Sequence, residues 1–284
     1  MEDCSSYSTL DRDRLREVVS ANAEALRLLR LGLNRQCLVP TDSALTNDVA
    51  RRVDELASLK RLAYLLVAEG RLREMDGEPG QAALVYTDLI RFGNEMSRGG
   101  FLINRLVGIA CEAIGYRPLA KLVPELEEKE AHSVIARLEQ VDQRRVTWKE
   151  VLNSERRYAR HRFAGRFPNP VAWVTGWWRS RDVIRKAEPK HLTIVAQERL
   201  LLAELALRCY RSERAQVPAR LEDLVPAYLS RVPQDPLGGK PLVYRPQGPN
   251  WLLYSVGNDR VDDGGKAASR GLETTGDIFF DSQR

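Results

Sequence analysis

The sequence predicts an α+β protein, with a mostly α-helical hairpin body over residues 1 to about 188, followed by a helix and a small antiparallel sheet. Two patterns support this prediction. Apolar residues recur every three to four positions through most of the first part, which is the period of an amphipathic helix. Near the C-terminus the apolar runs become short and lie between turns rich in Gly, Pro and Asp, which is typical of short strands.

Length and composition fit a folded, globular chain. The 284 residues are 43% hydrophobic and 29% charged, which excludes an intrinsically disordered protein. The net charge of +5 is too small by itself to indicate nucleic-acid binding. We divide the chain into a helical body at 1–143, a basic Trp-rich segment at 144–189 and an α+β module at 190–284.

The helical body is punctuated by Pro and Gly. The apolar period predicts helices over residues 11–38, 49–75, 81–97, 101–122 and 132–152. Asp76-Gly77-Glu78-Pro79-Gly80 is a strong turn between the second and third of them. This pair resembles a tetratricopeptide-type hairpin, but no second copy follows at a fixed period. We therefore predict a stack of helical hairpins and not a regular repeat.

The C-terminal module begins with a helix that is apolar over most of its circumference, at residues 192–210. A short helix at 220–228 and a dense turn at 233–239 follow. Strands are predicted at Pro241–Arg245, Trp251–Val256 and Asp277–Phe280.

Several motifs of this module occur in an order that resembles a known family. They are Leu207-Arg208-Cys209-Tyr210, Val217-Pro218, Leu221-Glu222-Asp223-Leu224, Val232-Pro233-Gln234-Asp235-Pro236, Leu242-Val243-Tyr244, Leu253-Tyr254-Ser255-Val256-Gly257-Asn258-Asp259, Asp262-Asp263-Gly264-Gly265 and Gly276-Asp277-Ile278. This series resembles the C-terminal part of type II secretion major pseudopilins, over about a third of the chain. The resemblance implies a helix that carries a small antiparallel sheet, and an extracytoplasmic or membrane-associated setting.

The chain also departs from that family. Pseudopilins begin with a prepilin peptidase site and a long apolar helix, whereas residues 1–13 here are acidic and polar. No stretch reaches the roughly 18 apolar residues of a membrane span, and no signal peptide is recognisable. The whole chain resembles uncharacterised bacterial proteins that join a helical N-terminal region to this module. The sequence itself leaves the localisation undetermined.

The resemblance implies a structural calcium ion in the acidic loop of the module. Carried over position by position, the candidate ligands are Ser255, Asp259, Asp262 or Asp263, and Asp277. Calcium prefers several oxygen ligands from a flexible loop, which this segment offers. The loop is not an EF-hand, because Val261 and Arg270 occupy ligand positions of that motif. The alternative is that these residues form turns in a solvated loop.

Residues 144–190 contain thirteen Lys or Arg against four Asp or Glu, and four of the five Trp residues. The segment could be a solvated helix face whose aromatic residues pack on the body. It could instead contact an anionic membrane surface, and the candidate contact residues are Trp173, Trp177, Trp178, Arg179, Arg181 and Arg185. Nucleic-acid binding through phosphates is the third and least favoured interpretation, because no nucleic-acid motif is present.

Catalytic signatures are missing from the sequence. His132, His161 and His191 are the three histidines, and none adjoins a nucleophile motif; GxSxG, HExxH, P-loop and GxGxxG patterns are absent. The four Cys residues form no CxxC pair. The sequence thus predicts no catalytic residues and a non-enzymatic binding or structural protein with a protein partner. A peripheral membrane protein that docks through 144–190 is the alternative, and a hydrolase is disfavoured.

Overall fold

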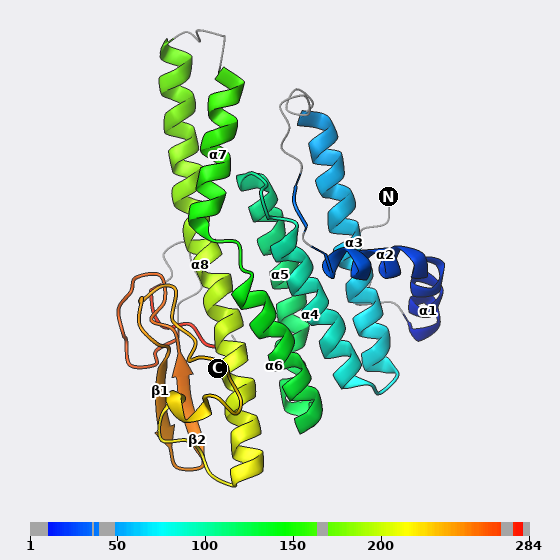
Figure 1. Cartoon of the computed structure of the whole chain (residues 1–284), viewed down its shortest axis with the longest axis vertical. Helices are drawn as coiled ribbons and strands as arrows, with labels where there is room; N and C mark the ends of the chain where they lie inside the picture. Colours follow the sequence, from blue (N-terminus) through cyan, green and yellow to red (C-terminus); the bar gives the residue numbers. More distant parts are fainter. Residues whose placement is uncertain (1–10, 36, 40–48, 164–169, 268–274, 281–284) are drawn as a thin grey trace. The chain divides into compact units, whose positions relative to one another are not determined.

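The computed structural model describes residues 11–35, 37–39, 49–163, 170–267 and 275–280, with the backbone alone for 49–53, 158–163 and 170–180 (Figure 1). It is mostly helical, with a two-stranded antiparallel sheet near the C-terminus, so the predicted α+β class is confirmed. The elements are α1 (Arg12–Ala21), α2 (Ala23–Leu33), α3 (Val49–Met75), α4 (Pro79–Glu95), α5 (Leu102–Leu122), η3 (Val123–Glu125), α6 (Glu128–Gln143), α7 (Trp148–Phe163), α8 (Pro170–Arg214), η4 (Leu221–Leu224), β1 (Val243–Gln247) and β2 (Asn250–Tyr254).

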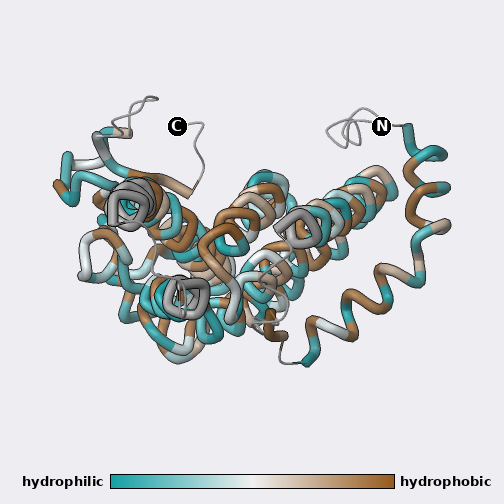
Figure 2. Tube along the Cα trace, turned by 90° about the horizontal axis from the view of Figure 1, so that it is seen from above, coloured by the Kyte–Doolittle hydropathy of each residue, from teal (hydrophilic) through white to brown (hydrophobic). Residues whose placement is uncertain are grey.

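The chain forms two compact units, which are described separately below. Unit 1 comprises Met1–Glu78, Asp88–Gly115 and Arg145–His191, and unit 2 comprises Pro79–Thr87, Tyr116–Arg144 and Leu192–Arg284. The helices carry both hydrophobic and hydrophilic residues along their length (Figure 2). The domain boundaries predicted from the sequence at 143/144 and 189/190 stay predictions.

Two of the predicted helices are interrupted. The one expected over 11–38 is split at Asn22, whose side chain donates to the Val18 carbonyl and ends α1. The one expected over 132–152 is split between α6 and α7, where the Val146 amide donates to Asn94 Oδ1 instead of to a helical carbonyl. Thr147 then caps α7, since its hydroxyl accepts from the Glu150 amide.

Conversely, the helix predicted over 192–210 is not a separate element but the C-terminal part of the long helix α8, which begins at Pro170 and continues through Pro189. The short helix predicted over 220–228 is the single 3-10 turn η4.

Close helix packing defines unit 1. A Cβ on Gly93 of α4 would lie 2.6 Å from the Gly108 carbonyl oxygen of α5, so the two backbones approach too closely for any side chain there. Two apolar clusters also form part of the core of unit 1. One joins Leu15 to Ala68 and Leu72, and the other joins Leu102 to Val146, Val151 and Ala187.

A buried charge network lies beside the second cluster in unit 1. The Arg105 guanidinium and the Glu112 carboxylate are both 0% exposed and form two hydrogen bonds of 2.6 and 2.9 Å. Arg105 Nε also donates to Nδ1 of His191 at 2.9 Å, and the His191 ring stacks on Trp148. Burial, with the positive charges of Arg105 and Arg145, lowers the pKa of His191 to about 3. His191 is therefore a neutral acceptor near neutral pH.

Unit 2 is built on the C-terminal part of α8. Trp251 Nε1 of β2 donates to Glu204 of α8 at 2.8 Å, and Arg199 of α8 donates to Asp142 of α6 at 2.8 Å. Strands β1 and β2 pair with Tyr244 opposite Leu253. The third predicted strand, 277–280, is wrong as a strand: it makes two isolated bridges, an antiparallel one between Ile278 and Ser255 and a parallel one between Asp277 and Ala267.

We expect His191 to make unit 1 sensitive to acid. The unfolded histidine binds a proton below about pH 6.5, whereas the folded one stays neutral down to about pH 3. Stability is therefore fully present above the unfolded pKa, and it falls by about 1.4 kcal/mol per pH unit as the pH drops below it. Urea unfolding at a series of pH values measures this slope.

The control is His191→Gln, which keeps an acceptor for Arg105 but cannot be protonated. The carboxylates titrate equally in both proteins, so the difference between the two slopes isolates His191. Parallel slopes between about pH 4 and pH 6 would contradict the assignment of a neutral buried imidazole.

Candidate functional site

The Asp235-Pro236 turn of unit 2 is organised by one buried carboxylate. Asp235 Oδ1 accepts from the Ser255 hydroxyl and from the Leu237 amide, each at 2.9 Å. Asp235 Oδ2 accepts from the Val256 amide at 2.9 Å. A single side chain thus ties the turn before β1 to the end of β2. It fixes Ser255, one of the predicted calcium ligands, in the interior.

Asp277, another predicted ligand, is 1% exposed and incompletely satisfied. Its Oδ2 accepts from the Gly265 amide at 2.7 Å, but Oδ1 is buried with no hydrogen-bond partner. Burial raises the pKa of Asp277 above its usual value, while the amides of Gly265 and Asp263 act in the opposite direction. A buried polar atom without a partner costs about 1–3 kcal/mol. Oδ1 is therefore a position where a bound cation would be stabilising.

The other predicted ligands already serve in turns. Asp259 accepts from the amides of Val261 and Gly276, at 3.2 and 3.0 Å. Asp262 accepts from the Tyr254 hydroxyl at 2.6 Å and pairs with Arg245. Asp263, which directly follows Asp262, is half-buried. The loop residues 268–274 lie outside the described part of the chain.

The described side chains of this loop do not by themselves form a metal site. Within the described residues, three candidate ligand atoms lie mutually within 4.8 Å at Glu128, His132 and Glu213, and not among the loop carboxylates. A calcium ion bound by the loop would therefore also need backbone carbonyl oxygens, which calcium accepts readily.

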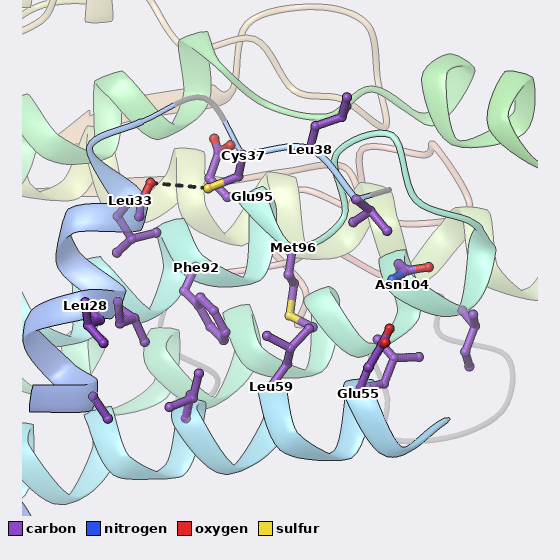
Figure 3. A pocket seen from close by; sticks show the side chains of 17 residues that line it. Leu28, Leu33, Cys37, Leu38, Glu55, Leu59, Phe92, Glu95, Met96 and Asn104 are labelled. Atoms are coloured by element: carbon purple, nitrogen blue, oxygen red, sulfur yellow. Dashed lines mark hydrogen bonds between the residues drawn. The ribbon is translucent and has the colours of Figure 1, made fainter. Parts of the chain in front are cut away.

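Unit 1 contains an apolar groove of about 610 Å³ between α2, α3, α4, the start of α5 and residues 37–39 (Figure 3). Leu28 of α2, Leu59 of α3, Phe92 of α4 and Met96 just after α4 point into it. Its lining is mostly apolar, and Glu55, Glu95 and Asn104 are its polar members. An open concave surface with this lining suits an apolar ligand or the apolar face of a partner.

The segment 37–39 forms one wall of the groove. The Val39 amide donates to the Arg98 carbonyl at 2.9 Å, and the Cys37 thiol donates to the Gly32 carbonyl at 3.3 Å. Burial and the charge of Glu95 raise the pKa of Cys37. Cys37 is therefore a thiol near neutral pH and not an activated nucleophile.

The predicted membrane contact residues are only partly described. Trp173, Trp177, Trp178 and Arg179 belong to α8, but their side chains lie outside the described residues. Arg181 and Arg185 are exposed, and Arg185 pairs with Asp182 at 2.9 Å. Trp148, also in the basic segment, packs against the cluster formed by Leu102, Val146, Val151 and Ala187. Membrane contact stays a prediction. In the described part of the chain, no helix has the length and apolar character that crossing a bilayer demands.

Comparison with known proteins returned no family model, no curated protein and no solved structure that matches this chain.

Several elements of these sites were not found from the sequence. Asp235 was expected to form a turn, but its bonds to Ser255 and Val256 span about twenty residues and carry no local signal. The groove was missed because its walls come from four helices and the segment 37–39. The spacing of Glu128 and His132, four residues apart, was a usable signal for a shared helix face. Glu213 was not, because it lies 81 residues from His132.

We expect the groove to bind a neutral apolar dye such as Nile red. Leu28 lines the groove and is 53% exposed, so Leu28→Asn should remove contact area without unfolding the helix. Loss of part of a leucine contact corresponds to about 1–1.5 kcal/mol, or a roughly tenfold weaker dye affinity. Fluorescence titration measures the change.

Leu31→Asn is the matched control, because Leu31 lies on the same helix, is 47% exposed and does not line the groove. Equal loss of dye binding in the two variants would show that the dye does not occupy the groove.

Proposed function

We propose that this chain is a non-enzymatic binding protein whose C-terminal module is a pseudopilin-like head stabilised by calcium. The observation that carries the proposal is Asp277 Oδ1, a buried carboxylate oxygen without a partner in the loop of predicted ligands. The module has the expected helix and antiparallel pairing beside it, in α8, β1 and β2.

The chemistry of the loop favours calcium over a transition metal. Its described candidate ligands are carboxylates and one serine hydroxyl, with no imidazole or thiol among residues 255–267 and 275–280. Such an all-oxygen set suits calcium, which tolerates irregular geometry and bidentate carboxylates.

The position of the ligands suggests a structural role. Ser255 and Asp277 are fixed to the sheet side, through the bridge between Ser255 and Ile278. Asp259, Asp262 and Asp263 belong to the loop. A cation shared by the two groups would hold the loop against the end of β2.

The groove supplies the binding function in unit 1. We propose that its occupant is the apolar face of an amphipathic helix from a protein partner. Leu56, Leu59 and Leu62 of α3 line it at helical spacing, so that the groove runs along a helix as helix-in-groove recognition requires. Glu55, an exposed acidic residue of the lining, favours basic residues on the partner helix.

Calcium should stabilise the head measurably. At a calcium concentration of about one hundred times Kd, the free energy of unfolding rises by about 2.7 kcal/mol. We expect a higher melting temperature in calcium than in EDTA for the wild type, and no difference for Asp277→Asn. The matched control is Asp182→Asn on α8, outside the loop, which should keep the full calcium response.

A folding defect in Asp277→Asn would not obscure the result, because terbium binding can be followed on the wild type alone. Tyr254 donates to Asp262, so it is placed to sensitise terbium luminescence from the loop. Calcium should displace the terbium signal. Identical melting curves of the wild type in calcium and in EDTA would rule out the proposed ion.

The alternative function, docking of residues 144–190 on an anionic membrane, is favoured by one feature. Arg181, Arg185, Lys186 and Lys190 are all exposed on α8, beside the exposed apolar side chain of Val183. This combination suits a headgroup layer.

Sedimentation with phosphatidylglycerol-containing vesicles tests this alternative. Each basic residue near such a surface contributes about 1 kcal/mol, so the double variant Arg181→Glu, Arg185→Glu should bind at least tenfold more weakly than wild type. The control is Arg14→Glu, Arg27→Glu, which changes the net charge equally on other helices. Absence of wild-type binding at low salt, or equal loss in the control, would remove the alternative.

A further inference from the structure

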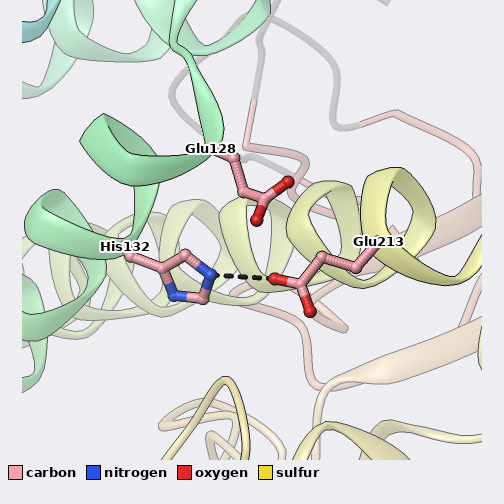
Figure 4. A group of neighbouring side chains, drawn as sticks. All are labelled: Glu128, His132 and Glu213. Atoms are coloured by element: carbon pink, nitrogen blue, oxygen red, sulfur yellow. Dashed lines mark hydrogen bonds and ion pairs between the residues drawn. The ribbon is translucent and has the colours of Figure 1, made fainter.

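Three side chains of unit 2 meet at the facing ends of α6 and α8 (Figure 4). Glu128 and His132 are one turn apart on α6, so both project from the same face. Glu213 projects toward them from the last turn of α8. His132 Nε2 lies 3.1 Å from Glu213 Oε1, and one ligand atom from each of the three residues lies within 4.8 Å of the others.

One aromatic residue orients two of these side chains. The Tyr228 hydroxyl donates to Glu213 Oε2 at 2.5 Å, which leaves Oε1 directed at His132. The Tyr228 ring also stacks on the His132 imidazole, with centroids 5.9 Å apart and planes at 18°. Tyr210 packs against Tyr228 from α8. Outer partners of this kind fix the direction of ligand side chains in metal centres.

Two carboxylates of the cluster lie close together, which favours a bound cation. Glu213 accepts from the Tyr228 hydroxyl and lies within hydrogen-bonding distance of His132. Glu128 brings a second carboxylate to the same point, and the capping box of α6 is made by Glu127 and Glu130, so capping does not account for Glu128. Two ionised carboxylates this close repel each other, and either a proton shared between them or a bound cation relieves the repulsion.

We propose that Glu128, His132 and Glu213 bind a divalent transition-metal ion, with zinc the best fit. Zinc takes imidazole nitrogen and carboxylate oxygen at about 2.0–2.2 Å, so tetrahedral ligands are about 3.3–3.6 Å apart. The 3.1 Å separation of His132 and Glu213 is close to this spacing. The imidazole selects against calcium and magnesium. Three protein ligands leave a fourth position for water.

The ion would join the first turn of α6 to the last turn of α8. These helices are already linked through Arg199 and Asp142 at 2.8 Å, further along α6. The metal would thus link the two helices at a second point and stabilise unit 2. This site is independent of the proposed calcium loop, since none of its ligands belongs to that loop.

Isothermal titration with zinc chloride alone, on the full chain freed of metal, tests the proposal. We expect one zinc ion per chain in wild type and at least a hundredfold weaker binding in His132→Ala. All three ligands are on the surface, so this change should leave the far-ultraviolet circular dichroism unaltered. Glu125→Gln, an exposed carboxylate just before α6, is the control and should bind as wild type does.

Two further variants separate a metal site from a plain ion pair. Tyr228→Phe keeps the ring stacking but removes the hydroxyl that orients Glu213, so zinc affinity should fall about tenfold. Asp277→Asn should leave zinc binding unchanged, which distinguishes failure here from failure of the calcium loop. Equal zinc affinity in wild type and His132→Ala would overturn the proposal.

Cobalt spectroscopy identifies the ligands directly. Cys209 lies one turn before Glu213 on α8, and its pKa is raised to about 11 by burial and by the charges of Glu213 and Glu128. Cobalt bound by Glu128, His132 and Glu213 should show visible bands without a thiolate-to-cobalt charge-transfer band. A thiolate band that disappears in Cys209→Ser would replace the three-residue site with a different one and overturn the assignment.

Discussion

The fold of the C-terminal α+β module depends on the carboxylate of Asp235. It accepts three hydrogen bonds, from Ser255, Leu237 and Val256. These bonds hold the Asp-Pro turn against the end of β2. Ser255 in turn makes the bridge to Ile278, next to Asp277. The placement of the proposed calcium ligands on the sheet side therefore follows from one buried acid, and loss of that acid would release both Ser255 and the segment that carries Asp277. A two-stranded sheet is marginally stable by itself, which makes such side-chain links necessary.

Unit 1 rests on a different kind of interaction. Arg105 and Glu112 form a fully buried pair, and His191 satisfies the remaining Arg105 Nε. Burying such charges is expensive, so the pair adds little net stability, but removal of either partner would strand the other. The pair therefore acts mainly by restricting how the helices that carry these side chains can pack. It requires α5 and α8 to place Arg105, Glu112 and His191 in one arrangement, in a unit where Gly93 and Gly108 already bring α4 and α5 into backbone contact.

The sequence predicted the long elements well and the junctions poorly. Helices α3, α4 and α5 have many apolar residues at helical spacing, and strong Gly and Pro stops separate them. The break before α7 depends on Asn94, fifty-two residues away, which captures the Val146 amide. The sequence did not predict that α8 continues across Pro189, because proline normally ends a helix. In the head, the turn-forming roles of Asp259 and Asp262 were one of two stated alternatives, and their hydrogen bonds to nearby amides fit it. The cluster around Glu213 required knowledge of which helix ends face each other.

The two proposed ions of unit 2 would act on different weaknesses of the same unit. The described part of the acidic loop offers oxygen atoms alone, whereas the α6–α8 cluster also offers an imidazole, which stacks on Tyr228. A donor set of oxygen atoms alone favours calcium, which accepts irregular coordination. A donor set that includes an imidazole favours zinc, which is usually tetrahedral. The sheet is anchored to α8 through Trp251 and Glu204, so an ion bound at the last turn of α8 would also stiffen the support on which the sheet lies.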